Sequence, residues 1–114
     1  MALTLISNDP NLLRLQAAGR IMHSQLAEEP DSLRTLTGPN GYARKVLVSL
    51  EQVGYIDSAG IGWLLSSHKR FQKAGGKLVL HSVPESVMQT LKVLRLDSIL
   101  NIAPDEAAAM ALAQ

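Results

Sequence analysis

The chain has 114 residues and no cysteine, so it is long enough for one domain with its own core and contains neither disulfides nor a thiolate metal site. Its formal net charge of +1 gives no indication of nucleic-acid binding, for which a clustered basic stripe is expected. No apolar run approaches the roughly 20 residues that span a bilayer, and the first residues do not resemble a signal peptide. We therefore expect a single cytoplasmic domain over residues 1–114, without membrane insertion.

The first part of the chain predicts a β-hairpin. Residues 3–6 read as a short strand, and residues 12–18 begin to alternate between apolar and polar as a second strand does. The sequence Asn8-Asp9-Pro10-Asn11 between them is typical of a turn, because Asn and Asp bond locally to the backbone and Pro fixes its own φ. We expect Gly19 to end the second strand.

Residues 20–44 predict a broken helical region. Scattered apolar residues can form the inner face of one or two short helices. Pro30 interrupts any helix there, because proline lacks an N–H and clashes with the preceding turn. The composition of residues 38–41, Gly-Pro-Asn-Gly, indicates a loop.

The clearest strand and helix follow. The apolar run of residues 46–50 predicts a buried strand, and a turn of small residues leads into an amphipathic helix over residues 60–74. Gly75-Gly76 supplies the left-handed residue that commonly closes a helix. The predicted inner face of this helix consists of Ile61, Leu64, Leu65, His68 and Phe71.

Two further strand–helix pairs complete the chain. Residues 77–82 predict a strand, and Pro84 is well placed as the first residue of the next helix. Residues 99–102 predict a short strand, and a final helix starts at residues 104–106. The predicted inner stripe of the helix after Pro84 consists of Val87, Met88, Leu91 and Leu94.

This alternation favours parallel strands joined by helices. We expect an α/β fold, a small mixed sheet of about four to five strands with helices mainly on one face.

Ser58 lies where the central strand is expected to end and the helix to begin. Backbone N–H groups are unpaired at such a place and the helix dipole favours negative charge, so it is a natural seat for an anion. A phosphate on Ser58 would add roughly −1.5 to −2 charges, which the helix would tolerate and a docked protein would not. The alternative is that Ser58 is only the N-cap, accepting a hydrogen bond from the N–H of Ile61 or a neighbour.

Residues 57–65, Asp-Ser-Ala-Gly-Ile-Gly-Trp-Leu-Leu, resemble the signature loop of STAS domains, the family of bacterial anti-sigma factor antagonists. The resemblance continues through residues 75–80, 84–96 and 99–102. It implies the same α/β fold and a partner kinase that phosphorylates the serine aligned with Ser58.

The leading hypothesis is therefore a non-enzymatic partner-switching module. Unphosphorylated, the surface of residues 55–63 would bind an anti-sigma factor/serine kinase; phosphorylation of Ser58 would release that kinase, and a separate phosphatase would reset the switch. Whether the domain forms a homodimer or binds a nucleotide, as some relatives do, stays open. The residues we assign to partner binding are Arg20, Tyr55, Asp57, Ser58, Ala59, Gly60, Gly62 and Trp63.

For three of these residues the sequence leaves two possible roles open. Asp57 either orients the Ser58 hydroxyl or caps the turn. Trp63 lies off the apolar stripe of its helix and is either an interface anchor or packed against a neighbouring element. Arg20 follows Gly19 where the family has an acidic residue, and it either pairs with a phosphate on Ser58 or is a solvated surface arginine.

Two other functions compete with the switch. A constitutive scaffold subunit of a signalling or transporter complex would use the same surface without phosphorylation. A small hydrolase with Ser58 as nucleophile is the second, but a nucleophile elbow needs glycine at position 56, which is Ile56, and nothing fixes His68 or His81 near the serine.

No cofactor or metal is expected. The histidines, which include His23, have no spacing typical of metal ligands, and the sequence contains neither a complete dinucleotide-binding glycine motif nor a Gly-Lys-Ser/Thr phosphate loop.

Overall fold

The computed structural model describes residues 2–21 and 37–114. These residues build one sheet of five strands in the order β1-β2-β3-β4-β5, with β1 antiparallel to β2 and each later pair parallel. Among the helices described, none has the length and hydropathy needed to cross a membrane. The strands are β1 Ala2–Asp9, β2 Leu12–Ile21, β3 Lys45–Ile56, β4 Lys77–His81 and β5 Asn101–Ala103. The helices are η1 Gly38–Ala43, α3 Ser58–Lys73, α4 Glu85–Val93, η2 Leu96–Ser98 and α5 Glu106–Ala113.

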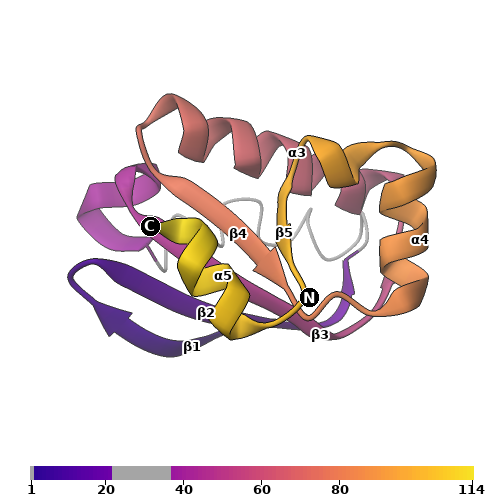
Figure 1. Cartoon of the computed structure of the whole chain (residues 1–114), viewed down its shortest axis with the longest axis horizontal. Helices are drawn as coiled ribbons and strands as arrows, with labels where there is room; N and C mark the ends of the chain where they lie inside the picture. The colour runs from indigo at the N-terminus through magenta and orange to yellow at the C-terminus, as the bar shows by residue number, and fades with distance from the viewer. Residues whose placement is uncertain (1, 22–36) are drawn as a thin grey trace.

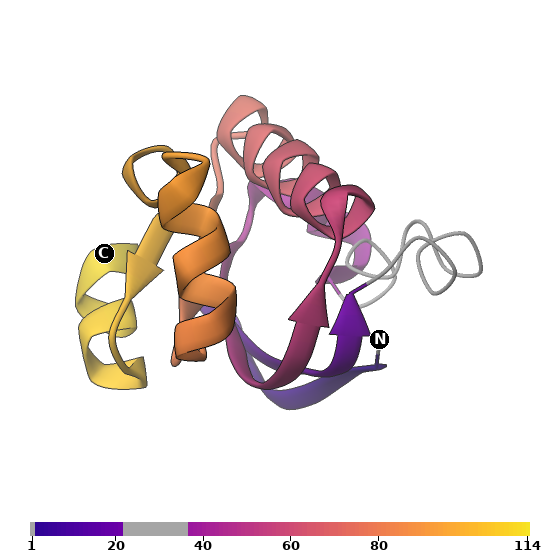
Figure 2. The ribbon, with the colours of Figure 1, turned by 90° about the vertical axis from the view of Figure 1, so that its right-hand side faces the viewer.

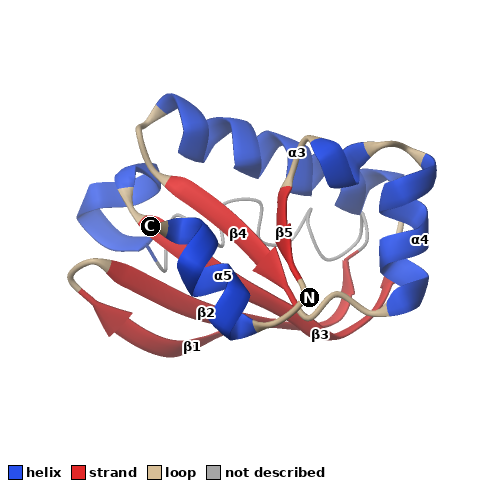
Figure 3. Cartoon of the chain, in the orientation of Figure 1, coloured by secondary structure: helices blue, strands red, loops and turns tan. Residues whose placement is uncertain are grey.

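The predicted α/β class and mixed sheet are confirmed (Figure 1, Figure 3). Helices α3 and α4 cover one face and enclose the larger core, which includes Leu15, Val48 and Phe71. The short α5 covers part of the other face through a small cluster around Leu47 and Val79. Figure 2 shows β5 between α4 and α5.

The central strand and its neighbour are longer than expected. β2 does not end at Gly19 but continues to Ile21, because Gly19 adopts a positive φ of 90° and register shifts on both sides keep the strand paired. That extra length of β2 pairs with β3 up to Ile56, so residues 54–56, expected in a turn, are strand. β4 pairs with β3 only over Lys45–Ser49, so the last residues of β3 pair with β2 alone.

The predicted loop at residues 38–41 is wrong in detail. These residues open the 3₁₀ helix η1, which is kinked at Gly41. Tyr42 from η1 meets Phe71 edge-on, with ring centroids 4.9 Å apart, and so joins this segment to α3. The short helices expected before it fall mostly on residues 22–36, which lie outside the described residues.

The helix predictions hold for the most part. The inner face of α3 is buried as expected, except that Leu65 is half-buried, and Gly75 closes the helix with a φ of 83°. Pro84 is the N-cap of α4, not its first residue. Leu94 was expected inside but is 52% exposed, because α4 ends at Val93 and the chain turns away.

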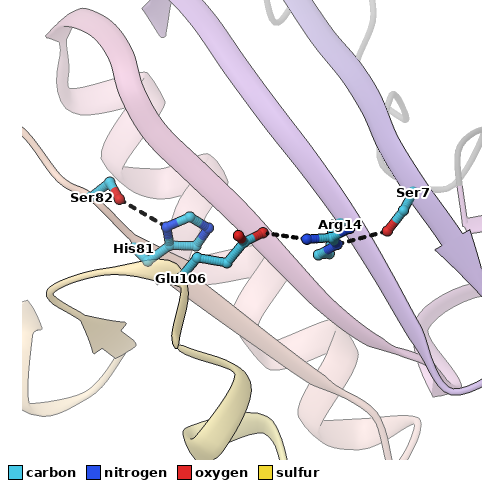
Figure 4. A network of polar contacts seen from close by, with 5 residues as sticks. All are labelled: Ser7, Arg14, His81, Ser82 and Glu106. Atoms are coloured by element: carbon cyan, nitrogen blue, oxygen red, sulfur yellow. Dashed lines mark hydrogen bonds and ion pairs between the residues drawn. The ribbon is translucent and has the colours of Figure 1, made fainter. Parts of the chain in front are cut away.

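The α5 face of the sheet carries a polar network, shown in Figure 4. The guanidinium of Arg14 on β2 donates from Nε to Ser7 Oγ at 2.7 Å and from Nη1 to Glu106 Oε1 at 2.9 Å, which ties the start of α5 to the sheet. His81, at the end of β4, is only 6% exposed, and its Nδ1 lies 2.9 Å from Ser82 Oγ.

Burial lowers the pKa of His81 below its ordinary value, although the carboxylates of Glu106, Asp105 and Glu51 partly oppose the shift. Because the unfolded chain then takes up this proton at higher pH than the folded chain, the contribution to stability is complete above about pH 6.5 and is lost as pH falls toward the folded pKa. We expect the free energy of unfolding, from urea denaturation, to decrease between pH 7 and pH 5 and to decrease less in His81→Gln. An identical pH slope in the variant would contradict this assignment.

Candidate functional site

The predicted surface around Ser58 is built where β2 and β3 end side by side, beneath the start of α3 (Figure 2). The register places Arg20 opposite Tyr55 and Ile21 opposite Ile56. The N–H of Asp57 then donates to the carbonyl of Ile21 at 3.2 Å, which fastens the strand-to-helix turn to β2.

Asp57 is the residue that caps α3. Its backbone is extended, and its carboxylate Oδ1 accepts a hydrogen bond from the N–H of Gly60 at 2.8 Å. Its carbonyl accepts the first helical bond, from Ile61, at 2.9 Å. The alternative that Ser58 is the N-cap is therefore wrong, and Ser58 is the first residue of the helix.

The Ser58 side chain is exposed. Within the part of the chain that the structure describes, its hydroxyl makes no hydrogen bond. With the cap supplied by Asp57, no contact among the described residues depends on this hydroxyl, which stands at the positive end of a 16-residue helix.

Asp57→Ala is expected to lower the free energy of unfolding by about 1 kcal/mol, because the N–H of Gly60 loses its acceptor. Asp57→Asn keeps an oxygen at this position, and we expect it to lower the free energy of unfolding by only a few tenths of the loss in Asp57→Ala. Ser58→Ala is the matched control, and we expect it to stay within about 0.5 kcal/mol of the parent. Urea denaturation of the three variants measures the order; a Ser58→Ala loss equal to that of Asp57→Ala would contradict the assignment of the cap.

The two glycines of the motif have different environments. Gly60 is buried, and a Cβ on it would lie 2.3 Å from the carbonyl oxygen of Ile21 and 2.6 Å from Cγ1 of Ile56. It lets α3 start directly against the ends of β2 and β3. Gly62 is exposed, and no described atom lies within 4 Å of the position its Cβ would take. Of the two, only Gly62 is exposed to solvent.

Aromatic and small side chains flank Ser58. Tyr55 is 50% exposed, Ala59 is half-buried, and Trp63 is partly buried against the larger core. Trp63 therefore packs on its own chain with part of its surface, while the remainder is open to solvent. We call Arg20, Tyr55, Ser58, Ala59, Gly62 and Trp63 the Ser58 surface.

Arg20 is exposed on this surface, at the end of β2. In the described part of the chain its guanidinium has neither a hydrogen bond nor an ion pair. Its neighbour Ile21 binds the N–H of Asp57, so the register brings Arg20 to the same end of the sheet as Ser58.

Neither of the two described histidines is hydrogen-bonded to Ser58. His68 is buried on α3, and the Nδ1 of His81 is bonded to Ser82; His23 lies outside the described residues. No hydrogen bond between described residues joins a histidine to Ser58. The described residues also contain no group of three or more potential metal ligands.

Comparison with known proteins places the chain in a family. A family model for the STAS domain matches residues 9–109. The fold is shared with an anti-sigma-factor antagonist (STAS) domain protein from Planctomyces limnophilus, at 19% identity and a TM-score of 0.78, with 98% of each chain covered.

Two other solved structures share the fold. The anti-sigma factor antagonist SpoIIAA, in its unphosphorylated form, is 17% identical with a TM-score of 0.66 over 93% of this chain and 91% of its own. A sulfate transporter family protein from Wolinella succinogenes is 16% identical with a TM-score of 0.74 over 92% of this chain and 86% of its own. Because the STAS model matches nearly the whole chain, including the Ser58 turn, the chain belongs to the STAS domain family.

Proposed function

We propose that the chain is an anti-sigma factor antagonist-like module that switches partners through reversible phosphorylation of Ser58. In its unphosphorylated form it binds an anti-sigma factor/serine kinase through the Ser58 surface. Phosphate on Ser58 dissociates the complex, and a phosphatase restores binding.

The observation that carries this proposal is that Asp57, and not Ser58, caps α3. Asp57 caps α3 through the N–H of Gly60, and the exposed Ser58 hydroxyl has no hydrogen bond to any described residue. A phosphate at the first position of a helix meets unpaired N–H groups and the positive end of the dipole. Phosphorylation is therefore compatible with the fold, as a reversible switch requires.

The surroundings of Ser58 suit a protein partner. The half-exposed Tyr55 and the partly exposed Trp63 offer aromatic area, which is enriched at interfaces, beside small residues that allow close approach. A phosphate in the middle of such a contact adds roughly −1.5 to −2 charges that the partner would have to desolvate. The related fold of SpoIIAA, solved in both an unphosphorylated and a phosphorylated form, supports the same regulation here.

A constitutive scaffold is the second candidate. The Wolinella succinogenes neighbour belongs to a sulfate transporter family, so this fold also occurs outside anti-sigma factor antagonists. By the resemblance, Arg20 stands where the family typically has an acidic residue, and this favours the scaffold because it changes the surface that a kinase would meet. Such a subunit would use the Ser58 surface without ever carrying phosphate.

Intact-mass analysis of the protein purified from the cells that make it separates the two candidates. We expect a phosphate-sized increment on the parent chain, none on Ser58→Ala, and an unchanged increment on Ser86→Ala. Ser86 is a matched control, an exposed serine in the first turn of α4. An unmodified parent chain in growing, stationary and stressed cells would favour the scaffold.

A further inference from the structure

The face of the sheet opposite α3 carries a cavity of about 240 Å³ that the Ser58 surface does not include. It lies beyond the part of this face that α5 covers, and strands β1 to β4 and the start of α5 all contribute to it. The lining residues that matter here are Ile6, Arg14, Gln16, Glu51, His81 and Glu106.

The charged groups of the cavity are held in place by the network of Figure 4. Arg14 is held by its bonds to Ser7 and to Oε1 of Glu106, and its charge is paired with that carboxylate. The figure shows the Glu106 carboxylate between Arg14 and the ring of His81. The second carboxylate oxygen of Glu106 makes no hydrogen bond to the described residues and remains available.

His81 contributes a buried ring, and only one of its two nitrogens has a hydrogen-bond partner among the described residues. Its side chain is 6% exposed, and Nδ1 is bonded to Ser82. Among the residues described, Nε2 has no partner, and Figure 4 shows that edge of the ring toward Glu106. Buried polar atoms are nearly always hydrogen-bonded, so a water or a ligand in the cavity must meet Nε2.

The sign of the charge identifies the class of ligand. Burial has the larger effect and lowers the pKa of His81, but the negative charges of Glu106, Asp105 and Glu51 all act at this ring. Glu51 is exposed and forms no ion pair with another described residue. An anion would therefore be repelled, and the described residues offer no cluster of three or more metal ligands. An organic cation fits.

Size and surroundings favour a side chain over a free metabolite. The cavity is smaller than the roughly 300–1,000 Å³ typical of small-molecule pockets. Ile6, which is 50% exposed, adds apolar area on which the aliphatic stem of a long basic residue can lie. A guanidinium presents a planar fork that matches a carboxylate such as that of Glu51 in a bidentate arrangement.

We propose that this cavity, on the face of the sheet opposite α3, binds an arginine side chain of a protein partner. The guanidinium pairs with Glu51 and with the available oxygen of Glu106, while the stem packs on Ile6. The domain then has two docking faces, and the second does not depend on phosphorylation of Ser58.

The test is an NMR titration of the full chain with the pentapeptide acetyl-Gly-Gly-Arg-Gly-Gly-amide. We expect saturable shifts at Gln16, Glu51 and the His81 ring, and none at Ser58. Replacing arginine by citrulline, its uncharged counterpart, should abolish them. Glu51→Gln should weaken binding about two- to fivefold, the range measured for exposed ion pairs, and Glu85→Gln, an exposed glutamate on α4, should leave it unchanged.

Several outcomes would overturn the assignment. Shifts absent with the arginine peptide, or equal with the citrulline peptide, would show that the cavity does not select a cation. Tighter binding of putrescine than of the arginine peptide would make it a small-amine site instead of a docking face. An unchanged affinity in Glu51→Gln would rule out the proposed pairing. Because Glu51 is exposed, we expect this variant to fold normally, and comparison of its NMR spectrum with that of the parent checks this.

Discussion

Gly60→Ala is expected to destabilise the chain by about 3 kcal/mol or more, enough to leave a small domain largely unfolded. The new Cβ would lie 2.3 Å from the carbonyl oxygen of Ile21, a backbone atom that cannot rotate away. That carbonyl also accepts the N–H of Asp57, so relieving the clash means separating α3 from β2 and weakening this bond.

Gly62→Ala is the matched control, two residues further along the same helix. No described atom lies within 4 Å of its Cβ position, and alanine is a better helix former than glycine by about 0.5–1 kcal/mol. We therefore expect the two substitutions to have opposite signs in urea denaturation followed by circular dichroism. Equal stability of the two variants would show that α3 does not start against Ile21.

The architecture could be predicted because its signals are local. The period of apolar residues in residues 46–50 and 61–71 marks a buried strand and a helix with one inner face, and their alternation selects parallel pairing. Element ends were less predictable, since they depend on partners far along the chain. β3 runs to Ile56 because β2, with Gly19 at positive φ and register shifts on both sides of it, stays paired with β3.

The same long-range pairing decides the details of the site. Serine and aspartate are both good N-caps, so the sequence alone does not choose between Asp57 and Ser58. The choice follows from the bond between the N–H of Asp57 and Ile21, which holds Asp57 extended just beyond the strand. The requirement for glycine at position 60 has the same origin, because the atoms that exclude a side chain belong to Ile21 and Ile56.

The polar network on the α5 face of the sheet could not be predicted from the sequence. Arg14 and Glu106 are 92 residues apart, and neither belongs to a recognisable motif. Their pairing depends on how β2, β4 and the start of α5 are arranged in space, which no local pattern contains. Contacts of this kind can be found only from the folded structure.

Under the proposed function, phosphorylation of Ser58 is expected to leave the fold intact and to weaken docking of the proposed partner kinase about a thousandfold, which corresponds to about 4 kcal/mol. The fold survives because acid in the first turn of a helix is favourable by about 0.3–1 kcal/mol. In the proposed complex docking fails because Ser58 is exposed on the docking surface, where the partner would have to desolvate the added charge.

Ser58→Asp reproduces part of that charge and allows both effects to be measured on pure protein. We expect its free energy of unfolding to equal or slightly exceed that of the parent, while its affinity, measured by calorimetry for the partner captured with Ser58→Ala, falls at least tenfold. Ser86→Asp places the same charge in the first turn of α4 and should bind like the parent. If Ser58→Asp were to bind as tightly as Ser86→Asp, the proposed contact with a kinase would not include Ser58. If Ser58→Asp were to unfold, Ser58 would have a structural role, which its lack of hydrogen bonds to described residues argues against.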